Sequence, residues 1–495
     1  MPMPLEKYAS NLLPINASLR DVLVGLNKGV CGLVLLMDPT GAVKGVLTDG
    51  DVRRALLEGA DLLDAASKHM NTKFLSARAG LPREDYLKLL SDRVRQLPVL
   101  DGQGRLVEII DLVDFWRKPI MEPNLGGNEL KYLSDCITSN WISSQGSYVR
   151  SFELNFAEYH GIEHALTTSN GTTALHLALT ALGIGPGDEV IVPDSTFAAT
   201  ANVVIHCGAQ PVFVDVCLDT WTMDPKKVRA AITERTKALI PVHLYGHPCD
   251  MDALLEIATE YHLKIVEDCA EAFGARYKGR LVGTCGDVGC YSFFSNKIIT
   301  TGEGGMVVTR DTALAQRMAM LRDHGMSPTR KYWHIAAGFN YRMTNMQAAV
   351  GLAQLERVDK FMTRRRSIDL RYRQNLAGEP GIVLQTRTAW ADPVMWLFTL
   401  RLDECTETDR NAVIASLGKR GVEARPFFPP LHGQPPYGEV MGSFEISERL
   451  GREGLSLPSS VTLKDADIDR ICAELKSVLL HWQVARLRPR ELEEV

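Results

Sequence analysis

The stretch Ile265-Val-Glu-Asp268-Cys-Ala-Glu271-Ala is an apolar run that ends in acidic residues, and further along comes Ser292-Phe-Phe-Ser-Asn296-Lys297-Ile-Ile-Thr-Thr-Gly302-Glu-Gly304-Gly305. The first stretch has the pattern of a buried strand with a carboxylate where the chain leaves the sheet. The second places Lys297 between apolar residues and a glycine-rich turn. Desolvation there lowers the pKa of the lysine and makes its amine a usable nucleophile.

Strand-like and helix-like segments alternate around this stretch from Phe152 onward. The strand candidates are Glu189 to Val192, Pro211 to Val214, Ala238 to Val242, Lys264 to Glu267, Val288 to Phe294 and Met306 to Thr309, and helical segments include Thr173 to Leu182 and Met251 to Tyr261. Such alternation predicts an α/β fold, a mainly parallel sheet with helices on both faces. Ligands bind such sheets at the carboxyl ends of the strands, where Asp268 falls.

A third segment predicts an anion site. In Ser169-Asn170-Gly171-Thr172-Thr173-Ala-Leu-His-Leu-Ala-Leu179 a polar, glycine-containing loop opens an amphipathic helix. The exposed N–H groups of a first helical turn, together with hydroxyl groups, bind phosphate without any basic residue. Taken alone, the segment fits an ordinary helix cap equally well.

The three segments together supply what pyridoxal phosphate requires. Its aldehyde needs a lysine, its pyridine nitrogen needs a carboxylate, and its phosphate needs N–H and hydroxyl donors. We therefore assign Lys297 and Asp268 as catalytic residues. The phosphate site is assigned to Gly171, Thr172, Thr173 and Ser292.

In order and spacing these residues resemble the DegT/DnrJ/EryC1/StrS family of sugar aminotransferases, over Leu125 to Leu480. Further family-like stretches are Trp141 to Gly146, Gly185 to Pro193, Pro241 to Gly246, Gly338 to Asn345 and Arg425 to His432. The resemblance implies a fold type I transferase with a small C-terminal domain. It also implies glutamate as amino donor and a nucleotide-linked keto sugar as acceptor.

The resemblance also implies roles for single residues. Lys297 matches the lysine that carries the cofactor as a Schiff base, and Asp268 matches the partner of the pyridinium nitrogen. Phe197 stands where an aromatic ring stacks on the cofactor, and Glu271 stands where the family places Gln, Glu or His beside it. Asn340 matches a residue that reaches the cofactor phosphate of the neighbouring subunit, which implies a homodimer or higher oligomer with shared active sites.

Several functional readings stay open at this point. Within the family the resemblance favours the branch that aminates C4 of GDP-4-keto-6-deoxy-mannose, and Lys297 argues against the dehydratase branch, which has histidine there. Alternatives are a UDP-linked or a 3-keto sugar. A protein of another class, a nucleotide-sensing regulator with a degenerate transaminase domain, is a further alternative. His243 and His432 receive no role.

The N-terminal part contains an internal repeat. At an offset of 63 residues, Asp38, Gly41, Val43 and Asp51 align with Asp101, Gly104, Leu106 and Asp114. Each copy predicts a strand, a turn, a second strand and a helix, the helices beginning near Asp49 and Asp111. This part resembles a pair of CBS domains, which implies an adenine nucleotide held by Thr48 and Asp51. A repeat that only packs and dimerises is the alternative.

Composition and the positions of proline and glycine set the remaining expectations. We predict a CBS pair over 1–118, a linker over 119–127 with two prolines and a Gly-Gly pair, a cofactor-binding domain over 128–360 and a small domain over 361–495. The net charge of -5 excludes a broad positive field for nucleic acid. The absence of a long apolar run predicts a cytoplasmic protein without membrane contact. Ten scattered cysteines predict reduced thiols and no metal site.

Overall fold

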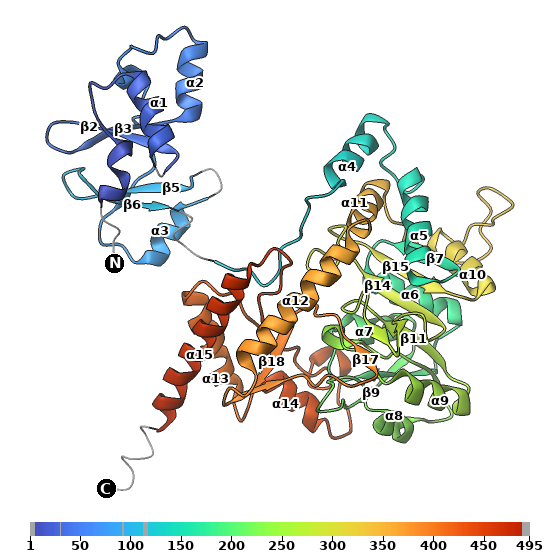
Figure 1. Ribbon diagram of the computed structural model, residues 1–495. Helices are drawn as coiled ribbons and strands as arrows, with labels where there is room; N and C mark the ends of the chain where they lie inside the picture. The colour runs from blue at the N-terminus through green and yellow to red at the C-terminus, as the bar shows by residue number, and fades with distance from the viewer. Residues whose placement is uncertain (1–4, 30, 92–93, 112–116, 488–495) are drawn as a thin grey trace, which may run out of the picture. The chain divides into compact units, whose positions relative to one another are not determined.

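The computed structural model describes residues 5–29, 31–91, 94–111 and 117–487. Clustering of its contacts divides the chain into two compact units, Met1–Trp116 and Arg117–Val495 (Figure 1). Within the described ranges, no helix has the combined length and apolar character needed to cross a membrane.

The first unit contains two three-stranded sheets of the same plan. One has the order β1 (Leu12–Pro14), β2 (Leu33–Met37), β3 (Val43–Thr48), and the other β4 (Ala77–Arg78), β5 (Gln96–Leu100), β6 (Leu106–Asp111). In both, a parallel pair is followed by an antiparallel hairpin. The two hairpins meet where the Val43 N–H donates to the Gly104 carbonyl at 3.0 Å. The two repeat copies therefore share one sheet plan and contact each other.

Helices complete the first unit. They are the 3-10 helices η1 (Leu5–Asn11) and η2 (Ala66–Lys68) and the α-helices α1 (Leu19–Lys28), α2 (Asp49–Leu57) and α3 (Arg83–Leu89). The helix expected from Asp49 is α2. The helix expected from Asp111 falls on residues 112–116, which lie outside the described residues.

A seven-stranded sheet forms the centre of the second unit (Figure 1, green to yellow). Its order is β7 (His164–Thr168), β15 (Gly305–Thr309), β14 (Val288–Ser292), β11 (Lys264–Asp268), β10 (Thr236–Leu239), β8 (Glu189–Pro193), β9 (Gln210–Val214). The pairs from β14 to β9 are parallel, whereas β15 is antiparallel to both of its neighbours. The mainly parallel sheet expected from the sequence is present, with β7 as a strand that the sequence did not indicate.

Helices cover both faces of this sheet. They are α4 (Glu129–Thr138), α5 (Ser147–His160), α6 (Gly171–Leu182), α7 (Ala199–His206), α8 (Pro225–Ala231), α9 (Met251–Tyr261), α10 (Thr312–Arg322) and α11 (Asn345–Leu355). Side chains alternate between the faces of a strand. Val190 and Val192 of β8 accordingly pack in a core with α6 and α7, while Ile191 packs in another with α9.

The C-terminal part of the second unit has its own antiparallel sheet. The order is β16 (Ile382–Leu384), β18 (Phe398–Leu402), β20 (Gly454–Leu457), β19 (Arg425–Pro426). The helices here are α12 (Val358–Leu376), α13 (Glu407–Lys419), η5 (Pro435–Tyr437), α14 (Glu445–Glu453) and α15 (Asp465–Leu487). The expected division between residues 360 and 361 lies inside α12. A three-stranded sheet of β13 (Arg280–Leu281), β12 (Arg276–Tyr277) and β17 (Ala391–Asp392) joins this part to the central one.

Residues 119–127, expected as a linker, are bound into the second unit. Ile120 is 2% exposed and packs in the main core, and its N–H donates to Glu423 Oε2 at 3.1 Å. Its carbonyl accepts from the Ser459 N–H at 2.8 Å. Arg357 of the α11–α12 junction donates to Asn124 Oδ1 at 2.8 Å. This segment is thus an integral part of the second unit.

Replacing Ile120 by Ala should lower the free energy of unfolding of the second unit by about 2–5 kcal/mol, because a buried side chain is removed from a packed core. Urea unfolding followed by tryptophan fluorescence measures the change. Leu125→Ala is the matched control, since Leu125 is 57% exposed. Equal stability of the Ile120 variant and the control would show that the segment is a free linker.

Candidate active site

Asp268 ends β11 at the carboxyl edge of the central sheet, where it is 5% exposed. Its Oδ2 accepts from the Thr200 hydroxyl at 2.8 Å and its Oδ1 accepts from the Ala270 N–H at 3.1 Å. Burial raises the pKa of Asp268, although these two hydrogen bonds and the charge of Lys297 act in the opposite direction. The fold therefore holds the Asp268 carboxylate in a fixed orientation in which it can pair with a cation.

Lys297 lies on the loop between β14 and β15. Its Nζ is 3.9 Å from Glu271 Oε1 and 4.0 Å from the centroid of the Trp396 ring. Burial lowers the pKa of Lys297, while the charges of Glu271 and Asp268 raise it. The structure thus brings together the lysine and the two acidic residues that the sequence indicated.

The backbone of the Lys297 loop is closed at its neck. Phe293 N–H donates to the Gly304 carbonyl at 2.8 Å, and Thr301 N–H donates to the Phe293 carbonyl at 2.9 Å. Trp396 Nε1 donates to the Asn296 carbonyl at 2.7 Å. These bonds fix the backbone from which the lysine side chain extends.

Glu271 is 5% exposed and faces Lys297 with one oxygen. Its other oxygen, Oε2, accepts from the Tyr245 N–H at 2.8 Å. Burial raises the pKa of Glu271 to about 7, against the lowering effect of Lys297. A carboxyl with this pKa can hold or release a proton near neutral pH.

The expected phosphate site lies at the N-terminus of α6. Asn170 caps the helix, and the Thr173 hydroxyl is engaged in that capping box. A Cβ on Gly171 would lie 2.7 Å from the Ser292 Cβ, so only glycine allows the helix start to approach Ser292 this closely. The first-turn N–H groups of a helix have no intrahelical acceptor. Together with the Ser292 and Thr172 hydroxyls they form a donor set that fits a phosphate.

Aromatic side chains line the region next to these groups. Phe197 is 60% exposed, and its ring lies 5.9 Å from that of Phe428. Tyr245 stacks against Phe428 on one side and Trp396 on the other. An exposed ring at position 197 is available to stack on a planar cofactor.

His432 connects the C-terminal part to the end of β8. Its Nδ1 lies 2.7 Å from Asp194 Oδ2, and its N–H donates to Asp194 Oδ1 at 2.7 Å. Asp194 is fully buried, and burial raises its pKa. Because Phe428 and His432 belong to one segment, this contact holds Phe428 beside Phe197. The structure thus gives His432 a structural contact.

Asn340 is exposed, and it pairs with Asp323 in an antiparallel bridge. The carbonyl of the next residue, Tyr341, accepts from the Ser169 N–H at 2.8 Å. The segment therefore runs beside the phosphate loop of its own chain, with the Asn340 side chain available to solvent or to another subunit.

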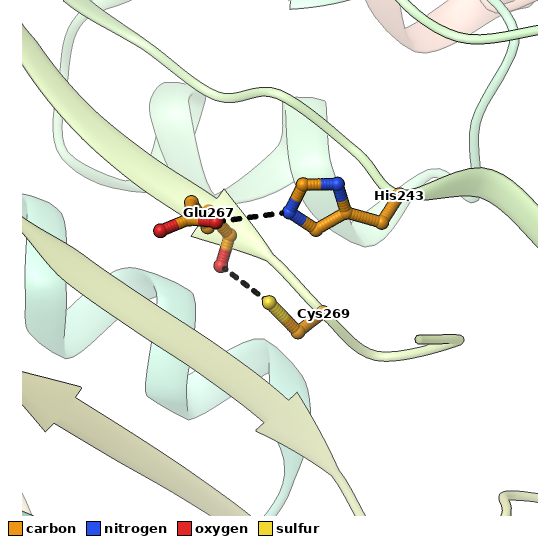
Figure 2. Close-up of side chains that lie close together, drawn as sticks. All are labelled: His243, Glu267 and Cys269. Atoms are coloured by element: carbon orange, nitrogen blue, oxygen red, sulfur yellow. Dashed lines mark hydrogen bonds and ion pairs between the residues drawn. The ribbon is translucent and has the colours of Figure 1, made fainter. Parts of the chain in front are cut away.

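His243, Glu267 and Cys269 lie close together and have the chemical types of metal ligands (Figure 2). Their bonds are those of a hydrogen-bonded cluster. His243 Nδ1 accepts from the Cys249 N–H at 3.0 Å, so the ring proton is on Nε2, which lies 3.1 Å from Glu267 Oε2. A metal ion would have to displace that proton.

The sequence reasoning gave no role in the site to four residues of this region, Thr200, Tyr245, Trp396 and Phe428. Tyr245 and Phe428 do lie within two of the family-like stretches, Pro241 to Gly246 and Arg425 to His432. Thr200 follows Phe197 by about one helical turn, a spacing that could have identified it. Trp396 comes from a distant part of the chain with no motif around it, so no local signal existed.

Residues 123–476 match the model of the DegT/DnrJ/EryC1/StrS aminotransferase family. A GDP-perosamine synthase of Caulobacter vibrioides is 50% identical over 369 residues, which cover 74% of this chain and 100% of that protein. A dTDP-3-amino-3,4,6-trideoxy-alpha-D-glucose transaminase of Streptomyces venezuelae is 42% identical over 351 residues, covering 69% and 91%. Among solved structures, the PLP form of a putative sugar aminotransferase from Streptococcus pneumoniae has a TM-score of 0.70 at 30% identity, covering 74% and 100%.

Replacing Glu271 by Gln should flatten the dependence of cofactor-free protein stability on pH. The folded pKa of about 7 lies above the ordinary 4.5, so the folded state keeps a proton that the unfolded chain releases. The contribution of this proton to the free energy of unfolding is complete at pH values below the ordinary pKa of Glu and is lost as the pH rises to about 7. Over that range the free energy of unfolding changes by up to ~1.4 kcal/mol per pH unit.

Urea unfolding between pH 5 and about 8 measures this slope. Glu256→Gln is the matched control, because the Glu256 side chain is 77% exposed. Indistinguishable slopes for the wild type and the Glu271 variant would contradict the assignment of the raised pKa.

Proposed function

Because the chain belongs to the DegT/DnrJ/EryC1/StrS aminotransferase family and is a pyridoxal-phosphate-dependent sugar aminotransferase, we propose that it transfers the amino group of glutamate to the C4 ketone of GDP-4-keto-6-deoxy-mannose. The observation that carries this substrate is the 50% identity over the full length of a GDP-perosamine synthase. Two further GDP-perosamine synthases, from Escherichia coli O157:H7 and Vibrio cholerae, are 45% and 43% identical.

Each side chain of the site then has a definite task. Bound pyridoxal phosphate supplies an aldehyde that takes up the amino group and a ring that withdraws electrons. Lys297 Nζ holds the cofactor and, once released, moves the proton from the donor's Cα. Asp268 keeps the pyridine nitrogen protonated, an electrostatic effect that is present before the reaction begins. Thr200 orients Asp268 through its hydroxyl.

The remaining cofactor contacts complete the proposal. Gly171, Thr172, Thr173 and Ser292 hold the phosphate, with Thr173 contributing through the cap it forms. Phe197 stacks on the ring, and Glu271 exchanges a proton with Lys297. Asn340 reaches the cofactor phosphate of a second subunit, which makes a homodimer the functional form. The exposure of Asn340 beside the phosphate loop supports this role.

A 3-keto acceptor is the second candidate. The Streptomyces venezuelae relative, which is named for a dTDP-linked 3-amino sugar, is 42% identical to this chain. A ketone at C3 or C4 would meet the same Lys297, so the acceptor pocket decides between them.

Purified protein with glutamate should convert GDP-4-keto-6-deoxy-mannose into a 4-amino sugar nucleotide, identified by mass spectrometry and NMR. UDP-linked 4-keto sugars and dTDP-linked 3-keto sugars form the comparison set. Lys297→Ala should lose the visible absorbance of the bound cofactor and turnover, because no other amine takes its place. Faster amination of a UDP- or dTDP-linked sugar than of the GDP-linked one would reject the substrate assignment.

For the first unit we propose a CBS-type module that binds an adenine nucleotide or the nucleotide sugar and modulates activity. Thr48 and Asp51 stand at the start of α2, where the Thr48 hydroxyl donates to Asp51 Oδ2 at 2.7 Å. Thr48 is exposed, so a ribose or phosphate oxygen could replace Asp51 as its partner. In the second copy Asp111 takes the place of the hydroxyl and accepts from Gln96 Nε2 at 2.8 Å.

Calorimetric titration of the full-length protein with AMP and ATP should show binding that Thr48→Val weakens by about tenfold, the equivalent of one lost hydrogen bond near 1.4 kcal/mol. Thr40→Val is the control, because its hydroxyl bonds only within its own turn. Absence of binding, with unchanged kinetics in the presence of nucleotide, would leave the module as an assembly element.

A further inference from the structure

The two acidic residues that end β11 have separate environments. Asp268 faces the proposed cofactor, whereas Glu267, on the opposite face of the strand, is fully buried. The Glu267 carboxylate accepts from the N–H groups of Gly283, Cys285 and Gly286 at 2.6–2.7 Å, and from His243. Burial acts to raise the pKa of Glu267, but these donors outweigh it and hold the pKa below its ordinary value.

His243 joins this buried carboxylate to the backbone around the site (Figure 2). Its ring is fully buried and uses both nitrogens, Nδ1 as acceptor from the Cys249 N–H and Nε2 as donor to Glu267. Its own N–H donates to the Asp268 carbonyl at 3.1 Å. The position of His243 is therefore set from three directions.

A strained turn follows His243. This turn is the 3-10 segment η4 (Leu244–Gly246), in which Tyr245 has φ +52° and Gly246 has φ +86°. A Cβ at Gly246 would lie 1.7 Å from the Val394 carbonyl oxygen. A non-glycine residue keeps such a conformation only where its surroundings enforce it. The bonds of His243 enforce it from one end, and the packing of the Tyr245 ring between Trp396 and Phe428 does so from the other.

The turn directs a hydrogen bond at the active site. Tyr245 N–H donates to Glu271 Oε2 at 2.8 Å, and the other oxygen of Glu271 lies 3.9 Å from Lys297 Nζ. A chain of contacts thus runs from Glu267 through His243 and the Tyr245 backbone to Glu271 and Lys297.

We propose that His243 is a positioning residue which, through its bond to Glu267, holds the Tyr245 turn and so keeps the Glu271 carboxyl beside Lys297. The proposal rests on the pyridoxal-phosphate chemistry of the family and is independent of the sugar that is aminated. The test must distinguish this positioning role from a purely structural one, in which His243 only fills the core.

Charged groups from several elements act along this chain of contacts. Glu271 and Asp268 act on Lys297, and Lys297 and Asp268 act on Glu271. From the other elements packed here come the Tyr245 hydroxyl, whose pKa is raised by burial and by Glu271 and lowered by the charge of Arg410, and the Trp396 ring. The His243 ring bonds to Glu267, and the His243 backbone N–H bonds to the Asp268 carbonyl. A displaced Glu271 would therefore change the proton affinity at the Lys297 nitrogen directly.

The test is a pH titration of the visible absorbance of the holoenzyme without amino donor, which reports protonation at the nitrogen joining Lys297 to the cofactor. His243→Asn keeps an acceptor for the Cys249 N–H but cannot reach Glu267, so we expect the midpoint to fall by about one pH unit, a tenfold loss of proton affinity. His243→Gln reaches Glu267 and should restore most of the midpoint. His262→Asn, at an exposed position, is the matched control and should leave it unchanged.

The decisive comparison introduces His243→Asn into the Glu271→Gln protein. If His243 acts through Glu271, His243→Asn should produce no further fall in the Glu271→Gln protein. A fall of the same size in both backgrounds, or no fall with His243→Asn alone, overturns the proposal. If His243→Asn yields no folded holoenzyme, Glu267→Leu takes its place, because leucine has no oxygen to accept from His243 Nε2, and an unchanged midpoint there also overturns the proposal.

Discussion

A largely buried lysine amine, with one carboxyl group beside it and the charge of a second acting on it, is the constraint around which the second unit is arranged. Burial lowers the pKa of Lys297 and raises those of Asp268 and Glu271, so each charge depends on the others and on nearby donors. Such groups are costly to bury unless they are hydrogen-bonded. The fold supplies those bonds from separate elements: Thr200 from α7 for Asp268, and the Tyr245 turn for Glu271.

The C-terminal part of the chain closes this arrangement. Trp396 lies over the lysine, and its indole N–H holds the Asn296 carbonyl. Phe428 extends the aromatic wall, and the bonds of Asp194 to His432 hold its segment in place. Residues 117–122 are bound to the same part. The site thus combines residues of the central sheet with the segments around Trp396 and Phe428, and its geometry depends on their mutual packing.

Local pattern predicted the central part of this structure well. The strands ending at Asp268 and Ser292 and the helix opening at Gly171 are recognisable because periodicity and capping are local properties. Local pattern did not predict β7, because His164–Thr168 mixes polar and apolar residues. It also did not predict that residues 119–127 bind to the second unit, because Pro and Gly there resemble a linker. Trp396 and Phe428 reach the site only through tertiary packing, which no spacing encodes. The ionic states of Glu267 and Glu271 likewise depend on donors supplied by remote loops.

The antiparallel arrangement of β15 has a mechanical consequence. It turns the Lys297 loop into the tip of a hairpin, with Ser292 opposite Gly305 in the sheet and Phe293 bonded to Gly304 at the neck. The flexible Lys297 side chain therefore extends from a backbone that the sheet holds in place. Under the proposed function the Lys297 amine would be released from the cofactor and bound to it again in each cycle, and a fixed backbone would return the amine to the same point.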